Sequence, residues 1–379
     1  MPTPPSITTR LLRLIVEHAS ISQSDLKVRS SLSMSAVSQA TNKLLNKGII
    51  RELGLRKVSM GRPKTLLGIN PDFTCVIGVQ LNTERNLIVM TDLAGTLIGE
   101  QQISIGKLTP KQLGDALAKF MKSTASHRNI GAIGLAISGV VDPDSGRCLR
   151  SFLLDWNNVD IASQLTERFS IPVFIENDAN ALALASVVFG QIGQSSSAIL
   201  ATFGQGIGAG IIINRQLYRG RHGNAGEIGN GLLGDGSERE LESVASSRAI
   251  LQYLLDHDPD IDKRNPPRTL QELELNPSPM AIETLTNAGH HLGVSLANLS
   301  IAFDPDIVYL TTEPQTVSRI LFDQVLQSFQ KYRLRVTPQV TPLHFLTESR
   351  MWAQGAAGFA VNRLLDMLAS EIDNEKQAN

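Results

Sequence analysis

The sequence predicts an α/β protein with two parts, a small basic head and a larger acidic body of two lobes. The chain has 379 residues and is 42% hydrophobic, which is enough for more than one core. Residues 1–70 contain eleven Lys and Arg but only three Asp and Glu, a net charge of +8, and the remainder carries −9. After residue 72, strand-like and helix-like segments alternate, and this pattern begins again near residue 196.

The head is predicted to span residues 1–70. Apolar residues at helical spacing predict a first helix over residues 7–20, Ser22 begins a short second helix, and Ser33 begins a third that ends before Gly48. The following segment predicts two strands around a basic loop. With the positive charge, this order indicates a winged helix-turn-helix that binds DNA. The alternative is a protein-interaction bundle, which does not require the basic loop.

The third helix carries short polar side chains on the face opposite its apolar residues. Such side chains approach base edges in the major groove, where Gln or Asn can pair with adenine. The basic loop contains the sequence GRPK, and arginine suits a narrow minor groove. The predicted DNA-binding residues are therefore Ser35, Ser38, Gln39, Asn42, Lys43, Arg62 and Lys64.

The body is predicted to consist of a first lobe over residues 71–190, joined by a C-terminal helix over 351–370, and a second lobe over 191–350. Between the lobes we expect a cleft. Residues 139–146 are predicted as a loop, and the proline- and charge-rich residues 256–280 as a surface excursion. The predicted strands are 75–81, 86–93, 96–105, 130–138, 171–178, a strand–turn–strand over 196–214, and 306–311; the predicted helices are 110–125, 179–190, 282–303 and 351–369.

Cysteine content and apolar runs exclude several classes of protein. Cys75 and Cys148 are the two cysteines, and they lie far apart in the sequence, which excludes a disulfide framework and a multi-cysteine metal site. The N-terminal residues lack the apolar core of a signal peptide, and no run approaches 18 apolar residues. We therefore expect a cytoplasmic protein that has no membrane partner.

Four segments in the body carry a resemblance to a known family. GLAISGVVDP, FIENDANALALA, GQGIGAGIIINRQLYRG and NAGEIGN occur in this order. Together they resemble the ROK family of repressors, open reading frames and kinases. With the winged head before them, the whole chain is similar to the N-acetylglucosamine-repressor type of transcription factor. The resemblance implies an actin-like, ribonuclease-H-like sugar-kinase fold whose two lobes close on a sugar.

The resemblance also implies which residues contact the sugar. Asn177 and Asp178 match the family's sugar-contacting pair, and family kinases use the position of Asp178 as a general base. Glu227 matches a further sugar contact, and Glu242 aligns with the glutamate that ends the family's zinc loop, so we predict all four as ligand-binding residues. The alternative is that Asn177 or Asp178 only caps the helix that follows.

The nucleotide and zinc motifs of the family are altered. Gln80 replaces an aspartate, Asn82, Thr83 and Glu84 replace a Gly-Gly-Thr turn, and Gln205 replaces a threonine. Because phosphoryl transfer requires positioning and charge neutralisation of the phosphate, we predict no catalytic residues and no enzyme activity. Asn230 replaces a zinc-binding histidine, and residues 231–241 contain no cysteine, so we predict no metal and no cofactor.

These observations predict a DNA-binding transcriptional regulator, a repressor of carbohydrate uptake or catabolism genes. The predicted partners are a double-stranded DNA operator, a sugar or sugar phosphate bound between the lobes, and further copies of the chain in a dimer or tetramer. Two alternatives remain open. One is an ATP-dependent sugar kinase with an appended DNA-binding head, and the other is a regulator whose body no longer senses a small molecule.

Overall fold

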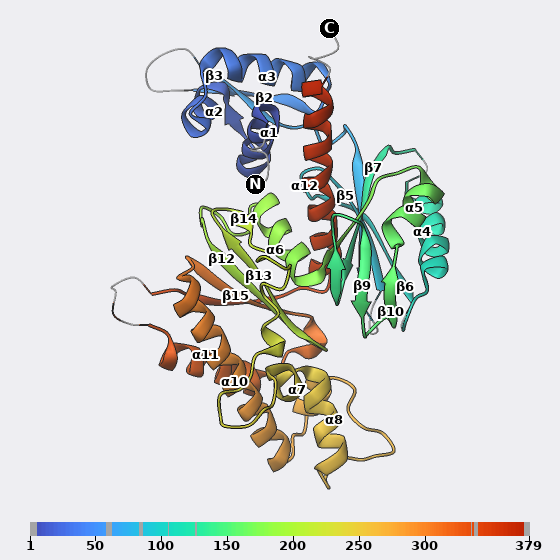
Figure 1. Cartoon of the computed structure of the whole chain (residues 1–379), viewed down its shortest axis with the longest axis vertical. Coiled ribbons are helices and arrows are strands. Elements are labelled where there is room, and N and C mark those ends of the chain that lie inside the picture. The colour runs from blue at the N-terminus through green and yellow to red at the C-terminus, as the bar shows by residue number, and fades with distance from the viewer. Residues whose placement is uncertain are drawn as a thin grey trace. The chain divides into compact units, whose positions relative to one another are not determined.

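The structure is a computed structural model that describes residues 6–57, 63–82, 86–104, 106–125, 127–334, 336 and 340–374. The chain divides into two compact units (Figure 1). Residues Gln194–Met351 form the second unit, and the described residues before and after them form the first unit, which includes the head. None of the described helices is long and apolar enough to span a membrane.

The head contains three helices and a small sheet, as the sequence predicts. Serine side chains begin all three helices: Ser6, Ser22 and Ser33 each accept a hydrogen bond from a backbone N–H in the first turn. The two wing strands pair antiparallel, and a two-residue strand beside them completes a sheet of order β1-β3-β2. The elements are α1 (Ile7–His18), β1 (Ile21–Ser22), α2 (Gln23–Ser30), α3 (Met34–Asn46), β2 (Ile50–Arg56) and β3 (Lys64–Ile69).

The remainder of the first unit is built on a five-stranded sheet of order β11-β7-β4-β5-β6. Strands β4, β5 and β6 pair antiparallel, whereas β7 and β11 add parallel. The elements are β4 (Cys75–Leu81), β5 (Asn86–Asp92), β6 (Leu97–Ser104), α4 (Pro110–Thr124), β7 (Ile130–Ile137), α5 (Ile161–Phe169), β11 (Val173–Asn177), α6 (Asp178–Val188) and α12 (Met351–Asn374).

The predicted loop over residues 139–146 is wrong in part. Val140–Asp142 forms strand β8, which pairs with β9 (Arg147–Ser151), and β9 pairs with β10 (Trp156–Val159) in a separate three-stranded sheet. The sequence gives little signal for β8 because it is three residues long and its Val140 side chain stays 45% exposed.

The second unit contains a five-stranded sheet of order β14-β13-β12-β15-β16. Strands β14, β13 and β12 pair antiparallel, whereas β15 and β16 add parallel. The order of antiparallel and parallel pairs is therefore the same as in the first unit. The restart of the strand pattern near residue 196 therefore corresponds to a second sheet of the same topology. The elements are β12 (Ala198–Phe203), β13 (Ile207–Ile213), β14 (Gln216–Leu217), α7 (Leu241–Ala245), α8 (Ser247–His257), α9 (Leu270–Glu274), α10 (Pro279–Phe303), β15 (Ile307–Thr312), α11 (Arg319–Tyr332) and β16 (Leu343–Thr347).

The predicted surface excursion over residues 256–280 is also wrong in part. Its helix α9 buries Leu270 and Leu273 in the core of the second unit. Asp258 is buried as well, and it accepts hydrogen bonds from the Ser278 hydroxyl and from the backbone N–H of Asp260. The segment is polar in composition because few of its residues point inward.

Helix α12 lies directly against the sheet of the first unit. Gly78 of β4 and Gly134 of β7 are neighbours in register. A Cβ atom at Gly78 would lie 2.1 Å from the carbonyl oxygen of Ala353, and one at Gly134 would lie 2.1 Å from that of Ala356. Only glycine allows the helix backbone to approach the strands this closely.

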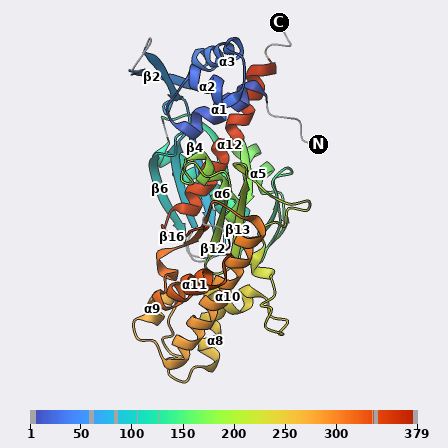
Figure 2. The same ribbon diagram turned by 90° about the vertical axis from the view of Figure 1, so that its left-hand side faces the viewer.

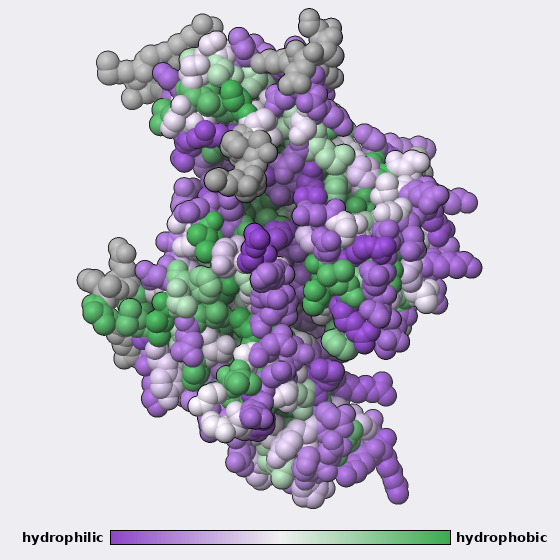
Figure 3. Space-filling view, viewed as in Figure 1, coloured by the Kyte–Doolittle hydropathy of each residue, from purple (hydrophilic) through white to green (hydrophobic). Residues whose placement is uncertain are grey.

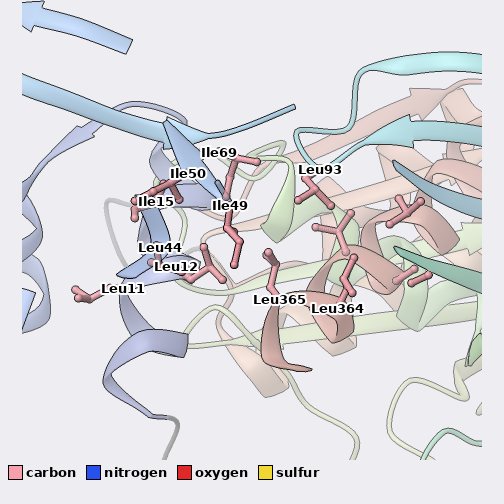
Figure 4. Packing of buried hydrophobic residues seen from close by; sticks show 14 of the residues in the cluster. Leu11, Leu12, Ile15, Leu44, Ile49, Ile50, Ile69, Leu93, Leu364 and Leu365 are labelled. Atoms are coloured by element: carbon pink, nitrogen blue, oxygen red, sulfur yellow. The ribbon is translucent and has the colours of Figure 1, made fainter. Parts of the chain in front are cut away.

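Beyond the sheet, α12 continues to the head and shares a core with it. Leu364 and Leu365 belong to the same buried cluster as Leu12 and Ile49 of the head, and Figure 4 shows Ile49 between the head leucines and Leu365. Burying a leucine side chain contributes roughly 2 kcal/mol. The head is therefore part of the first unit rather than a domain on a free linker.

Polar contacts reinforce this shared core. Arg13 of α1 donates hydrogen bonds to both carboxylate oxygens of Asp366, at 2.9 and 2.7 Å. Thr8 donates to Asp373 at 2.7 Å. Figure 2, turned by 90°, shows α12 passing from the sheet to the helices of the head.

Candidate functional site

Helix α3 presents the predicted DNA-binding side chains on one face. Ser35, Gln39 and Asn42 are exposed, and Ser38 and Lys43 are half-buried beside them. The opposite face is buried in the core of the head through Val37, Ala40 and Leu44. Five of the seven predicted DNA contacts therefore lie on a single helix surface.

A buried threonine that the sequence analysis did not predict as functional fixes α3 against α2. Thr41 is fully buried, and its hydroxyl donates to the carbonyl of Val37 at 2.8 Å. The same hydroxyl accepts a hydrogen bond from Nε2 of Gln23 at 2.8 Å. Its position on the apolar face of the helix, next to Ala40, is the sequence signal that could have identified it.

The wing contacts α2 through an acidic residue. Asp25 accepts hydrogen bonds from Arg56 at 2.6 Å and from Lys64 at 3.2 Å. Partial burial raises the pKa of Asp25, but hydrogen bonds from Ser22, Lys64 and Arg56 outweigh it and lower the pKa to about 2. The predicted contact Lys64 is thus engaged within the head, and Arg62 lies outside the described residues.

The junction of β11 and α6 positions Asn177 and Asp178. Asn177 caps α6: its Oδ1 accepts from the backbone N–H of Asn180 at 3.2 Å, and its Nδ2 donates to the carbonyl of Gly139 at 3.1 Å. Asp178 Oδ1 accepts from the N–H of Ala179 at 2.8 Å. Asn177 thus has the capping role, and a sugar contact by either residue stays a prediction.

A buried glutamate supports this junction, and it was not predicted from the sequence. Glu176 is 1% exposed. Its Oε1 accepts hydrogen bonds from the backbone N–H of Asn177 at 3.0 Å and from the side-chain amide of Asn180 at 3.5 Å. A charged residue at the end of an apolar strand, directly before the Asn-Asp pair, is the signal that could have identified it.

Glu242, in the second unit, supports the turn between β12 and β13. Its Oε2 accepts the backbone N–H of Ile207 at 2.9 Å, and its Oε1 lies 3.6 Å from Arg248. Glu227 is exposed and accepts a hydrogen bond from the Asn230 amide at 3.4 Å. The role of Glu227 and Glu242 as ligand contacts stays a prediction.

Of the altered nucleotide motif, the structure describes the strands and part of the turn. Gln80 is buried in β4, whereas Thr83 and Glu84 lie outside the described residues. Gln205 is half-buried in the turn after β12, where the N–H of Gly204 donates to the carbonyl of Gly206 at 3.1 Å. The loss of phosphoryl transfer that these residues imply stays a prediction.

Hydrogen bonds organise the loop that replaces the expected cysteine-containing segment. Asp235 accepts from the Ser237 hydroxyl and from Arg239, the latter at 3.1 Å. Hydrogen bonds from Ser237, and then from Arg239, lower the pKa of Asp235 to about 2. Among the residues that the structure describes, no group of three or more His, Cys, Asp or Glu could hold a metal ion.

Comparison with protein families identifies both parts of the chain. The ROK family model matches residues 76–362, and a winged helix-turn-helix DNA-binding model matches residues 6–51. The xylose repressor of Bacillus spizizenii is 27% identical over 374 residues, which are 94% of this chain and 95% of that protein. The DNA-binding transcriptional dual regulator NagC of Escherichia coli is 28% identical over 331 residues, 83% of this chain and 82% of NagC.

Solved structures with this fold include a regulator and a kinase. A ROK family transcriptional regulator described as a homolog of the E. coli MLC protein superposes with a TM-score of 0.79 at 22% identity, covering 96% of this chain and 97% of that one. A ROK family glucokinase from Streptomyces griseus, solved with glucose and AMPPNP, gives a TM-score of 0.62 at 24% identity and covers 76% of this chain and 99% of its own. The fold is therefore common to regulators and kinases.

Proposed function

Because the chain belongs to the ROK family and begins with a winged helix-turn-helix, we propose that it is a DNA-binding transcriptional repressor of genes for carbohydrate uptake or catabolism. The observation that carries this function is the exposed polar face of α3, with Ser35, Gln39 and Asn42, on a head of net charge +8. Positive charge supplies affinity for the phosphate backbone, and the polar face supplies contacts to bases.

Oligomeric binding to DNA belongs to the same proposal. Two copies related by a two-fold axis present two α3 helices to successive major grooves of a pseudo-palindromic operator. Duplexes selected by the protein from a random-sequence library should then contain inverted repeats. Selected duplexes that contain single, unrepeated sites would contradict the two-fold arrangement.

Gln39 tests the base-reading role of α3. Gln39→Ala should relax the preference for one base pair of the selected duplex, a loss of about 1–3 kcal/mol of discrimination, since a bidentate amide contact is removed. Lys27→Ala in α2 is the contrasting variant, because it removes an exposed positive charge and should weaken binding to all duplexes without changing base preference. Unchanged base preference in Gln39→Ala would contradict the assignment of this face.

A sugar or sugar phosphate is the proposed effector, contacted by Asn177 and Asp178. Relatives are named a xylose repressor and an N-acetylglucosamine repressor, so xylose, N-acetylglucosamine and their phosphates are the first candidates. An amide and a carboxylate together can donate to and accept from neighbouring hydroxyls. Helix α6 begins at this pair, and its packing on α1 of the head supports an effect on DNA binding.

The route from effector to head runs within the first unit. Val188 and Phe189, at the end of α6, pack against the cluster that contains Leu11 and Leu12 of α1. A sugar that binds one arrangement of α6 more tightly than another would change the population of head orientations by that difference in affinity.

Asp178→Asn tests the effector site. A sugar at one hundred times its Kd should stabilise the protein by about 2.7 kcal/mol, and Asp178→Asn should remove this stabilisation while the protein still binds DNA. The control is Asp160→Asn, because Asp160 caps α5 in the same unit with the same charge. Loss of DNA binding by Asp178→Asn alone would show that Asp178 has a structural role. Stabilisation by none of the sugars would favour a body that does not sense small molecules.

The proposal includes the absence of sugar phosphorylation. It is supported by the relatives that are named repressors and by Gln80 in place of an acidic residue. Incubation with ATP, Mg²⁺ and a panel of hexoses and pentoses should give no turnover above that of a heat-denatured sample. Measurable sugar phosphate would support the kinase alternative.

A further inference from the structure

The outer part of the wing has little apolar packing. β2 is an edge strand, and after Ile50 each of its residues is exposed. Leu53 is an extra residue in β2, because the register with β3 shifts between Glu52 and Gly54. Leu55 stays 68% exposed. Hydrophobic burial therefore does not fix the end of the wing.

A single carboxylate contacts both wing strands at their outer end. Arg56 and Lys64 are cross-strand partners and form the last pair before the basic loop. Arg56 reaches Asp25 Oδ2 at 2.6 Å, and Lys64 reaches Asp25 Oδ1 at 3.2 Å. Each strand is thereby joined to a different oxygen of the same residue in α2.

The Asp25 side chain is itself held in place. The Ser22 hydroxyl, which caps α2, donates to Asp25 Oδ2 at 2.8 Å and accepts from the Asp25 backbone N–H at 3.2 Å. Two residues earlier, Gln23 donates to Thr41 of α3 at 2.8 Å. The first turn of α2 is therefore connected both to α3 and to the wing.

Neither attraction to DNA nor a contribution to folding stability explains an acidic residue at position 25. In a head of net charge +8 that meets a polyanion, an acidic residue weakens attraction to DNA and occupies two cations. Its ion pairs are partly exposed, with side-chain exposures of 29% for Asp25, 33% for Lys64 and 47% for Arg56. Such pairs add little to folding stability.

We propose that Asp25 is a positioning residue that fixes the wing relative to α3 and thereby increases discrimination between operator and unrelated DNA. The inference rests on the proposed function as a DNA-binding regulator. Because Asp25 sets the spacing between α3 and the wing before binding, both can contact DNA at the same time only on a duplex whose sequence suits that spacing.

Asp25→Asn separates positioning from charge. The probes are a duplex selected by the wild-type protein from a random-sequence library and a scrambled duplex of the same length and composition. The variant should bind the scrambled duplex two- to fivefold more tightly, because a negative charge is lost and two cations are released. It should bind the selected duplex more weakly, so that the ratio of the two affinities falls about tenfold or more.

Asp72→Asn is the matched control. Asp72 lies 3.5 Å from Arg51 at the opposite end of β2, and its side chain is 83% exposed. This variant removes the same charge next to the head, and its affinity ratio should equal that of the wild type. An equal loss of discrimination in both variants would overturn the proposal.

Other outcomes are equally distinct. Parallel increases in affinity for both duplexes with Asp25→Asn, at an unchanged ratio, would show that Asp25 acts only through charge and would overturn the proposal. If Asp25→Asn does not fold, Arg56→Gln should lower the ratio in the same direction, because Arg56 contacts Asp25 and is not a predicted DNA contact, and an unchanged ratio would overturn the proposal. A wild-type protein that binds neither duplex would instead contradict the proposed function.

Discussion

The two units contain sheets with the same strand order, but the closest glycine contact of a helix is with the sheet in the first unit, whereas in the second unit glycines of α10 bring it against another helix. In the first unit, Gly78 and Gly134 lie in the strands and allow the backbone of α12 to rest on the sheet. In the second unit, Gly289 and Gly293 lie in α10, where a Cβ atom would be 2.4 Å from the Leu321 carbonyl and 2.6 Å from the Val325 carbonyl of α11.

The two pairs of glycines therefore position different parts of the molecule. Because α12 continues from the sheet to the core of the head, the glycines of the first unit influence where the head lies. The glycines of α10 bring two helices together within the second unit. On the face shown in Figure 3, polar residues cover most of the surface, and hydrophobic residues form several small groups.

Gly78→Ala should have the largest effect. Its Cβ atom would meet backbone atoms of α12, so neither side can move away cheaply, and we expect a destabilisation of about 3 kcal/mol or more. Hydrogen exchange should show lost amide protection in β4, α12 and the head together. Gly204→Ala is the control, because no atom lies within 4 Å of the added Cβ. Protection lost in β4 and α12 but retained in the head would contradict the coupling of head and sheet.

Gly293→Ala should have an intermediate effect. Crowding against Val325 and Ser328 costs about 2 kcal/mol, but alanine gains about 1 kcal/mol in helix propensity, so the net destabilisation should be about 1 kcal/mol. Amide protection should fall in α10 and α11 and remain unchanged in the head. Equal loss of protection in the head would eliminate the difference between the two units.

Asp366→Asn should have the smallest effect. The Arg13–Asp366 pair is 39% and 35% exposed, so its removal should cost less than about 1 kcal/mol, while the shared core still holds the head on α12. Asp115→Asn is a comparable control, since Asp115 pairs with Arg168 at 2.7 Å in the same unit. A head that melts separately only in Asp366→Asn would show that the ion pair, rather than the core, joins the head to α12.

Much of the architecture follows from local sequence. Serine caps and apolar spacing predict the three helices of the head, and runs such as Cys75–Leu81 predict buried strands. Helix α11 was not predicted, although Leu321, Val325 and Phe329 repeat at helical spacing. Helix α5 and strand β16 were also not predicted, because both are short and partly exposed.

The candidate sites could be predicted less completely. The exposed face of α3 follows from helical periodicity, because residues opposite Val37 and Leu44 must point outward. The roles of Glu176, Thr41 and Asp25 do not follow from the sequence, since each depends on a partner supplied by another turn or another element.

By itself, the sequence determined the three helices of the head, the strands of the five-stranded sheet in the first unit and the separation of charge between head and body, because caps, periodicity and charge are local properties. Only the tertiary structure decided that the head shares its core with the C-terminal helix and that Lys64 pairs with Asp25. Those contacts join residues as far apart as Arg13 and Asp366, and no local pattern specifies which distant side chain fills a given space.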